Sequence, residues 1–145
     1  MKLEIRQPET PAEWEKYYEI RWKILREPWD QERGNEKDNL EAKAYHLLAK
    51  EKKEILGVGR IHLNSTKEAQ VRYMAVLPQA QGRGIGAKIL KELEEFVKEI
   101  NIEKIILNAR EDAVPFYQRA GYQIIGDGET LFGTIHHKKM QRDFY

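Results

Sequence analysis

The chain contains 145 residues, of which 41% are hydrophobic and 34% are charged, and its formal net charge is +1. These values predict one folded domain over residues 1–145, and they exclude a global basic field that would attract nucleic acid. Cysteine is absent, which excludes disulfides, thiolate catalysis and cysteine–zinc sites. Because no apolar run resembles a signal core or a membrane span, we expect a cytoplasmic protein without a membrane partner.

The N-terminal segment predicts a strand followed by a helix. Leu3 and Ile5 alternate with charged residues, as in a short strand. Thr10 is suited to cap a helix that begins at Pro11, and Glu13 would complete a capping box. The helix is expected to run to about residue 25, with an inner side formed by Trp14, Tyr17, Tyr18, Arg21, Ile24 and Leu25.

Residues 26–39 form a polar stretch that indicates a loop with room for one helical turn, since it contains Pro28 and Gly34. Loops of this length in compact domains are often functional, although a mobile surface loop is an equal alternative. We interpret Trp29 within it as a hydrophobic anchor rather than a ligand contact.

The middle of the chain predicts an antiparallel meander of three strands, at residues 44–49, 55–63 and 70–77. Gly57 and Gly59 lie early in the second strand, where a bulge or a close backbone approach is expected. Pro78 cannot donate to a sheet and therefore ends the third, central strand.

A glycine-rich turn, Gln81 to Gly86, leads from the central strand into an amphipathic helix. Its apolar stripe is Ile85, Ile89, Leu90, Leu93, Phe96, Val97 and Ile100, and its polar side offers pairs four residues apart, at 88/92, 91/95 and 94/98. Glycines tolerate positive φ and let backbone approach a ligand, and a helix N-terminus attracts anions. The turn therefore predicts a phosphate site, against the alternative of a plain connection.

Two other nucleotide motifs fit this turn less well. Residues 82–87 match G-x-G-x-x-A, but a dinucleotide fold places this loop in its first βαβ unit and an acid after the next strand. Here the turn lies in mid-chain, and the next predicted strand, residues 104–107, is followed by Asn108. A P-loop requires Gly-Lys-Ser/Thr, which residues 86–89 lack.

The C-terminal part predicts a strand, a helix and a final strand pair. Residues 105–107 are wholly apolar, as in a parallel strand buried on both faces. Residues 112–119 predict a second helix, with Gly121 at its C-terminal cap. Residues 122–125 and 137–144 are expected to pair across a long loop. The resulting order, β-α-loop-β-β-β-α-β-α-β-β, predicts a mixed three-layer α/β fold.

Two motifs resemble the GNAT superfamily of N-acetyltransferases. Gln81-x-x-Gly84-x-Gly86, directly after a strand, resembles the acetyl-CoA signature Arg/Gln-x-x-Gly-x-Gly/Ala of that family. Residues 108–126 resemble its second conserved stretch, with matches at Ala113, Phe116, Tyr117 and Gly121, and Tyr122 in place of the usual Phe. The resemblance covers nearly the whole chain and thins out over residues 26–43. It implies a GNAT-like α/β fold with a mixed central sheet of six to seven strands flanked by helices.

The resemblance implies acetyl-CoA as the cofactor. The pyrophosphate would lie on backbone N–H groups of residues 82–87, and the pantetheine arm would pair with the central strand at Met74 and Val76. A backbone N–H near Val76 would face the thioester oxygen. Asn108 would hydrogen-bond the pantetheine or, alternatively, cap a helix, and Arg83 would contact phosphate or solvent. The predicted cofactor site is Met74, Ala75, Val76, Gln81, Gly82, Arg83, Gly84, Ile85, Gly86, Ala87, Asn108 and Phe116.

The same resemblance makes Tyr117 the candidate general acid for a departing thiolate, against the alternative of a core tyrosine. The general base is open between His62 and Glu27, and His62 also fits a hydrogen-bonded histidine of the sheet. His136 and His137 are adjacent and would point to opposite faces of a strand, so no metal site is expected.

The expected reaction is direct attack of a primary amine, of a small molecule or a peptide, on acetyl-CoA, catalysed by a monomer or homodimer. The acceptor pocket is predicted from residues 26–39, from Tyr73 and from the loop before residue 137, with Arg26, Glu27 and Tyr73 as substrate contacts. Glu27, Asp30 and Glu32 suit a cationic amine, whereas Arg26 and Arg33 suit a carboxylate. The alternatives are another acyl-CoA as donor, a non-catalytic CoA-binding module, and a different nucleotide-binding domain.

Overall fold

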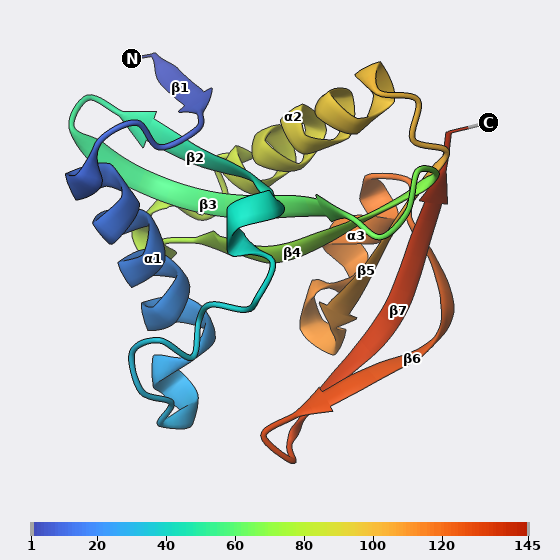
Figure 1. The fold of residues 1–145 in the computed structure, drawn as a ribbon. Coiled ribbons are helices and arrows are strands. Elements are labelled where there is room, and N and C mark those ends of the chain that lie inside the picture. The colour runs from blue at the N-terminus through green and yellow to red at the C-terminus, as the bar shows by residue number, and fades with distance from the viewer. Residues whose placement is uncertain (1, 145) are drawn as a thin grey trace.

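The computed structural model describes residues 2–144, which form a seven-stranded mixed sheet and three helices (Figure 1). The strands are β1 (Leu3–Arg6), β2 (Tyr45–Glu51), β3 (Glu54–Leu63), β4 (Glu68–Val76), β5 (Lys104–Arg110), β6 (Gln123–Leu131) and β7 (Ile135–Asp143). The helices are α1 (Pro11–Leu25), α2 (Ile85–Glu99) and α3 (Val114–Arg119). The sheet order is β1-β2-β3-β4-β5-β7-β6, and β4 with β5 is its parallel pair. None of the helices in residues 2–144 is long and apolar enough to cross a membrane.

The sheet lies between two helical layers, as predicted. The inner side of α1, including Tyr17 and Ile20, packs with Leu48, Ile55 and Val58 on one face of the sheet. On the opposite face, α2 and α3 enclose the larger core, which includes Ile89, Leu93, Val97, Ile105, Leu107, Tyr117, Tyr122 and Met140. Figure 1 shows α1 alone on the near face, with α2 and α3 behind the strands.

Local sequence signals set the helix ends. The Thr10 hydroxyl accepts a 3.1 Å hydrogen bond from the Glu13 N–H, as expected for an N-cap, but the Glu13 carboxylate returns to the Glu9 N–H rather than to Thr10. At the end of α3, Gly121 has φ +97°, and the Gly121 and Tyr122 N–H groups donate to the carbonyls of Gln118 and Tyr117. This is a Schellman motif, which confirms the predicted glycine cap.

A bulge in β4 reverses the faces of its side chains. Val58 of β3 pairs with Ala75 and Arg60 pairs with Arg72, so Tyr73 and Met74 together oppose Gly59, and Tyr73 has φ +60°. Before the bulge, Ala69 and Val71 face the α2 core, whereas after it Ala75 faces α1. Burial alternates without interruption along β4, but the bulge changes which helix layer the buried residues meet.

The two parallel strands separate just before the bulge. β4 pairs with β5 only at residues 68–70 against 104–106, while β5 continues alongside β7 as far as Arg110. In Figure 1, β5 and β7 turn away from β4 toward the bottom of the view. The sheet is therefore split along its middle.

Several sequence predictions require correction. Asn108 lies within β5 and pairs with Lys139, so it neither follows a strand nor caps a helix. β5 is not buried on both faces, since every second residue is only half-buried. β6 and β7 form a long hairpin joined by residues 132–134 instead of short strands across a long loop. The predicted 94/98 pair is replaced, because Glu94 is buried and accepts hydrogen bonds from Tyr122 and Arg142.

Candidate active site

A pocket of about 130 Å³ occupies the split between β4 and β5. Its walls come from the end of α1, from both strands, from the start of α3 and from the β6–β7 hairpin. The lining residues are Leu25, Arg26, Trp29, Gln70, Val71, Arg72, Tyr73, Met74, Asn108, Ala109, Arg110, Ala113, Tyr117, Glu129, Leu131, Ile135 and His137. The pocket thus joins Arg26, Tyr73, Met74, Asn108 and Tyr117 of the predicted site.

The phenol of Tyr117 lines this pocket. The side chain is 8% exposed, and within residues 2–144 its hydroxyl makes no hydrogen bond, although its ring packs edge to face on Phe116 and Tyr122. Burial raises the pKa of Tyr117 well above its usual value, and Arg110 opposes this rise. The phenol therefore stays protonated and can donate a hydrogen bond to a bound ligand.

Arg72, Arg110, Glu129 and His137 are charged or titratable pocket residues that were not assigned to the site from the sequence, although Glu129 lies in the loop that was predicted to border it. The Nδ1 atom of His137 lies 3.1 Å from the carbonyl oxygen of Glu129 and 3.0 Å from that of Ile135. Because carbonyl oxygens only accept, Nδ1 carries the proton and Nε2 carries the lone pair. Strand alternation placed His137 on the face opposite His136, but only the β6–β7 hairpin shows that this face lines the pocket.

The glycine-rich turn offers open space at the start of α2. Gly82 and Gly84 have φ +82° and +77°, and a Cβ atom on either would meet nothing within 4 Å. Gly84 is the N-cap, and no side chain of the described residues caps the first turn. Unpaired N–H groups, positive φ and unfilled space are what a phosphate group requires, so this turn fits the pyrophosphate of CoA.

The residues predicted around the turn lie together. A Cβ on Gly86 would come within 3.4 Å of the Phe116 ring and 3.6 Å of Val76. The Gln81 side chain donates a 3.2 Å hydrogen bond to the Val76 carbonyl, and the Arg83 guanidinium pairs with Glu51 at 2.5 Å. A pantetheine arm would therefore compete with Gln81 for the Val76 carbonyl, and a phosphate would compete with Glu51 for Arg83.

Four further members of the predicted cofactor site have simple positions. Ile85 and Ala75 are buried, Ala75 on the α1 face of the sheet, whereas Ala87 is exposed on the first turn of α2. Met74, the second residue of the bulge, lines the pocket.

The two predicted bases do not line the pocket. Glu27 is exposed at the start of the 3₁₀ turn Glu27–Trp29. His62 is buried in β3, where its Nδ1 lies 2.9 Å from an Arg60 nitrogen and its Nε2 lies 3.2 Å from Asn64 Oδ1. Burial and the Arg60 charge lower the pKa of His62. His62 therefore fits the alternative of a hydrogen-bonded histidine of the sheet.

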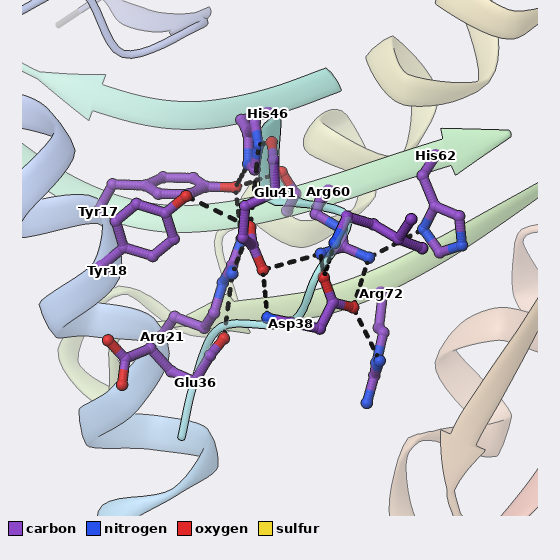
Figure 2. A network of polar contacts seen from close by, with 12 residues as sticks. Tyr17, Tyr18, Arg21, Glu36, Asp38, Glu41, His46, Arg60, His62 and Arg72 are labelled. Atoms are coloured by element: carbon purple, nitrogen blue, oxygen red, sulfur yellow. Dashed lines mark hydrogen bonds and ion pairs between the residues drawn. The ribbon is translucent and has the colours of Figure 1, made fainter. Parts of the chain in front are cut away.

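A buried polar network fixes residues 36–41 against α1 and the sheet (Figure 2). The fully buried Arg60 donates to Asp38 at 2.7 Å and to Glu41 at 2.9 Å, and Arg21 pairs with Glu41 at 2.9 Å. Asp38 also accepts from Arg72 at 3.0 Å. The Arg21, Arg60 and Arg72 guanidiniums all lie over the Tyr73 ring, at 4.2, 4.9 and 4.7 Å from its centroid. The network holds the bulged residue Tyr73 in place, and this part of the predicted loop is ordered by ion pairs.

The loop after α1 was predicted to bring both acids and arginines to the acceptor site, but of these residues only Arg26 lines the pocket. Arg26 and Trp29 reach the pocket, so Trp29 contacts the site instead of only anchoring the loop. Glu27, Asp30 and Glu32 are exposed and lie outside the lining. Arg33 pairs with Glu36 at 3.8 Å, away from the pocket.

Comparisons with known proteins agree with this architecture. The model of the acetyltransferase (GNAT) family matches residues 14–122. The uncharacterised N-acetyltransferase YjcF of Bacillus subtilis is 31% identical over 106 residues, which cover 73% of this chain and 75% of YjcF.

Two solved structures share the fold at low identity. The crystal structure of Ard1 from Thermoplasma volcanium has a TM-score of 0.84 and 18% identity, and the match covers 100% of this chain and 99% of that chain. An aminoglycoside 6′-N-acetyltransferase complexed with coenzyme A has a TM-score of 0.81 and 13% identity, over 100% and 98% of the two chains. With three quarters of its length matched by the family model, the chain belongs to the GNAT acetyltransferase family.

Proposed function

We propose that the protein transfers the acetyl group of acetyl-CoA to a primary amine of a small molecule or peptide by direct attack. The observation that carries this proposal is the free phenol of Tyr117 in a pocket between the separated β4 and β5, next to an open glycine turn. Acetyl-CoA supplies an activated acetyl thioester. The CoA complex of the structurally similar aminoglycoside acetyltransferase supports this choice of donor.

Each residue has a defined task in this proposal. Residues 82–87 hold the pyrophosphate through backbone N–H groups and the positive end of α2. Tyr117 lines the pocket between β4 and β5, and its hydroxyl can give a proton to the sulfur of CoA as the thiolate leaves. Asn108, from β5, also lines the pocket and can hydrogen-bond the pantetheine.

The acceptor amine must lose a proton before it attacks. His137 supplies the lone pair of Nε2 for this task, and its Nδ1 proton is fixed by two backbone carbonyls. We therefore assign the base to His137 in preference to Glu27 or His62, which lie outside the lining.

The test is thiol release from acetyl-CoA with a panel of primary amines, followed by mass spectrometry of the acetylated product. Tyr117→Phe protein is the matched control, since it keeps the ring but lacks the hydroxyl. Amine-dependent thiol release that requires Tyr117 is the expected result. CoA binding without thiol release for any amine would make the protein a CoA-binding module, and release only with longer acyl-CoA donors would change the donor.

A further inference from the structure

The pocket carries an excess of positive charge. Three of its lining residues are arginines, Arg26, Arg72 and Arg110, and among the described residues Glu129 is the single acid of the lining. Glu129 is exposed at the rim, whereas Arg26 is 7% exposed. A cationic amine alone would meet repulsion here, so the charge pattern calls for an anion in the pocket.

Arg26 is the strongest indication. Its Nε donates to the Asn35 carbonyl at 3.2 Å and its Nη1 to the Leu25 carbonyl at 2.9 Å, and no carboxylate within residues 2–144 pairs with it. The guanidinium lies 5.6 Å from the Tyr73 ring centroid and 5.5 Å from that of Phe132. A buried guanidinium held by neutral groups is costly unless a ligand brings its counter-ion.

Arg72 and Arg110 also line the pocket, and each has guanidinium N–H groups that are not used in a hydrogen bond within residues 2–144. Arg72 uses one Nη for Asp38 at 3.0 Å and packs 4.7 Å from the Tyr73 ring centroid that Arg26 also faces. Arg110 has its nearest carboxylate oxygen, of Asp112, at 3.9 Å, and lies 5.6 Å from the Trp29 ring centroid. Their remaining N–H groups are suited to a carboxylate or phosphate, which guanidinium forks bind with two hydrogen bonds.

We infer that the acceptor is a small amine that also carries an anionic group, a carboxylate or a phosphate monoester, bound by Arg26 with Arg72 and Arg110 beside it. This inference rests on the proposed function, because the same molecule must present its amine to the acetyl group. In this inference Glu129, the acid of the lining, pairs with the ammonium group of the ligand while Arg26 binds its anion. The glycine turn, which holds the CoA phosphates in the proposal, contributes no residue to this pocket.

The test uses acceptor pairs in which one member carries the anionic group and the other has a neutral amide or hydroxyl in its place. The pairs are glycine with glycinamide, 4-aminobutyrate with 4-aminobutyramide, and phosphoethanolamine with ethanolamine. In the wild-type protein, kcat/KM from thiol release should favour the anionic member of at least one pair by about tenfold or more. A carboxylate pair and the phosphate pair distinguish the two sources of anion. Equal or higher kcat/KM for every neutral member would overturn the inference while leaving the acetyltransferase proposal intact.

Variants assign the effect to Arg26. Arg26→Gln should reduce the anionic-to-neutral ratio to about one, and Arg26→Lys should retain part of it. Arg33→Gln removes a charge from the same loop outside the pocket and should leave the ratio unchanged. A ratio that persists in Arg26→Gln would show that the anion binds elsewhere.

A second readout does not depend on turnover. Inorganic phosphate should raise the melting temperature of the CoA-bound wild-type protein more than chloride at equal ionic strength, and Arg26→Gln should lose this difference. If no amine releases thiol, the proposed function fails, and the phosphate shift still reports on the anion site. An equal response of both proteins to phosphate would overturn the anion site itself.

Discussion

Tyr117 and Tyr122 pack edge to face with their ring centroids 5.9 Å apart, yet their hydroxyl groups have opposite surroundings. Tyr122 donates a 2.8 Å hydrogen bond to Glu94, which joins the cap of α3 to the middle of α2. The Tyr117 hydroxyl instead borders the pocket between β4 and β5. The Schellman motif that ends α3 places these two rings in contact and divides structural and chemical tasks between them.

Tyr117→Phe and Tyr122→Phe should therefore have opposite effects. Tyr117→Phe should lower kcat by about 10²-fold with little change in CoA affinity or melting temperature, since only the proton donor is lost. Tyr122→Phe should keep kcat and lower the free energy of unfolding by about 1–2 kcal/mol, because buried Glu94 loses a partner. Steady-state kinetics and urea unfolding of both proteins provide the test. Normal turnover in Tyr117→Phe, with chemistry limiting the rate, would show that Tyr117 has only a structural role.

The second prediction concerns the glycine turn. Gly84→Ala should raise the Kd for CoA by about tenfold or more, since the methyl group projects into the space that a phosphate would use and strains a residue at φ +77°. Gly34→Ala is the matched control, because Gly34 has φ +107° and open space but lies in the loop after α1. Both variants should lose similar stability, and calorimetry should find weaker CoA binding only for Gly84→Ala. Equal CoA affinity in the two variants would contradict the phosphate site.

Adjacent histidines test the assignment of the base. His137→Gln should lower kcat/KM for the amine by about 10²-fold and flatten the acid side of its pH profile, because Nε2 no longer accepts the proton. His136→Gln should change neither quantity, since His136 is exposed on the other face of β7, beside Thr130. An unaltered pH profile in His137→Gln would leave the base to another group.

Substitution of Glu129, which lines the pocket, can be compared with substitution of Glu27, which does not. Glu129→Gln should raise the KM for the amine by about three- to tenfold and leave the KM for acetyl-CoA unchanged, because a rim charge contributes modestly to binding. Glu27→Gln should leave both KM values unchanged, since Glu27 lies outside the lining. A rise in amine KM only for Glu27→Gln would favour the role that the sequence predicted for Glu27.

The polar network around Asp38 predicts how the free energy of unfolding depends on pH. Burial by itself would raise the pKa of Asp38, but hydrogen bonds from Arg60 and from the Leu40 N–H hold this pKa well below its usual value. A depressed carboxyl pKa contributes stability above the unfolded-state pKa of about 3.9, and this contribution is lost as the pH falls toward the folded-state value. The free energy of unfolding should therefore fall steeply below about pH 4.

Asp38→Asn should cost about 3 kcal/mol at pH 7, because it leaves the fully buried Arg60 with Glu41 alone, and the decline below about pH 4 should become shallower. Asp127→Asn also removes an ion pair, with Lys138, but at an exposed site where solvent screens the charges, and should change the pH curve far less. Denaturant unfolding between about pH 2 and 8 measures both effects. Identical acid limbs in wild type and Asp38→Asn would contradict the role of Asp38.

Much of the fold was predictable from local patterns. Thr10 with Pro11 defined the start of α1, Gly121 defined the end of α3, and the apolar stripe of α2 is buried except near its end, where Phe96 is half-buried and Ile100 is exposed. The predicted closeness at Gly57 and Gly59 is also confirmed, because a Cβ on Gly59 would come within 2.8 Å of Ile89. These features depend on neighbours in sequence, which residue patterns record.

The pocket was predictable only in part. Tyr117, Tyr73 and Arg26 reach it as expected, but Glu129 and His137 enter through a hairpin whose length and register are long-range properties. The positive φ of Tyr73 could not be predicted, since a bulky aromatic residue rarely adopts it and the burial of β4 alternates as in a regular strand. The charge of the pocket depends on which acids face solvent, and the loop composition does not reveal this.

The bulge at Tyr73 and Met74 limits the insertions and deletions that β4 can tolerate. Because two residues oppose Gly59 at the bulge, loss of one would restore regular pairing with β3 and leave Ala75 opposite Val58 on the α1 side. The single residue left opposite Gly59 would face α2, as Gly59 does, so no side chain would occupy the place of the Tyr73 ring against Arg21, Arg60 and Arg72. The length of β4 is thus constrained more tightly than the identity of most of its residues, and insertions or deletions within it should be far less tolerated than substitutions.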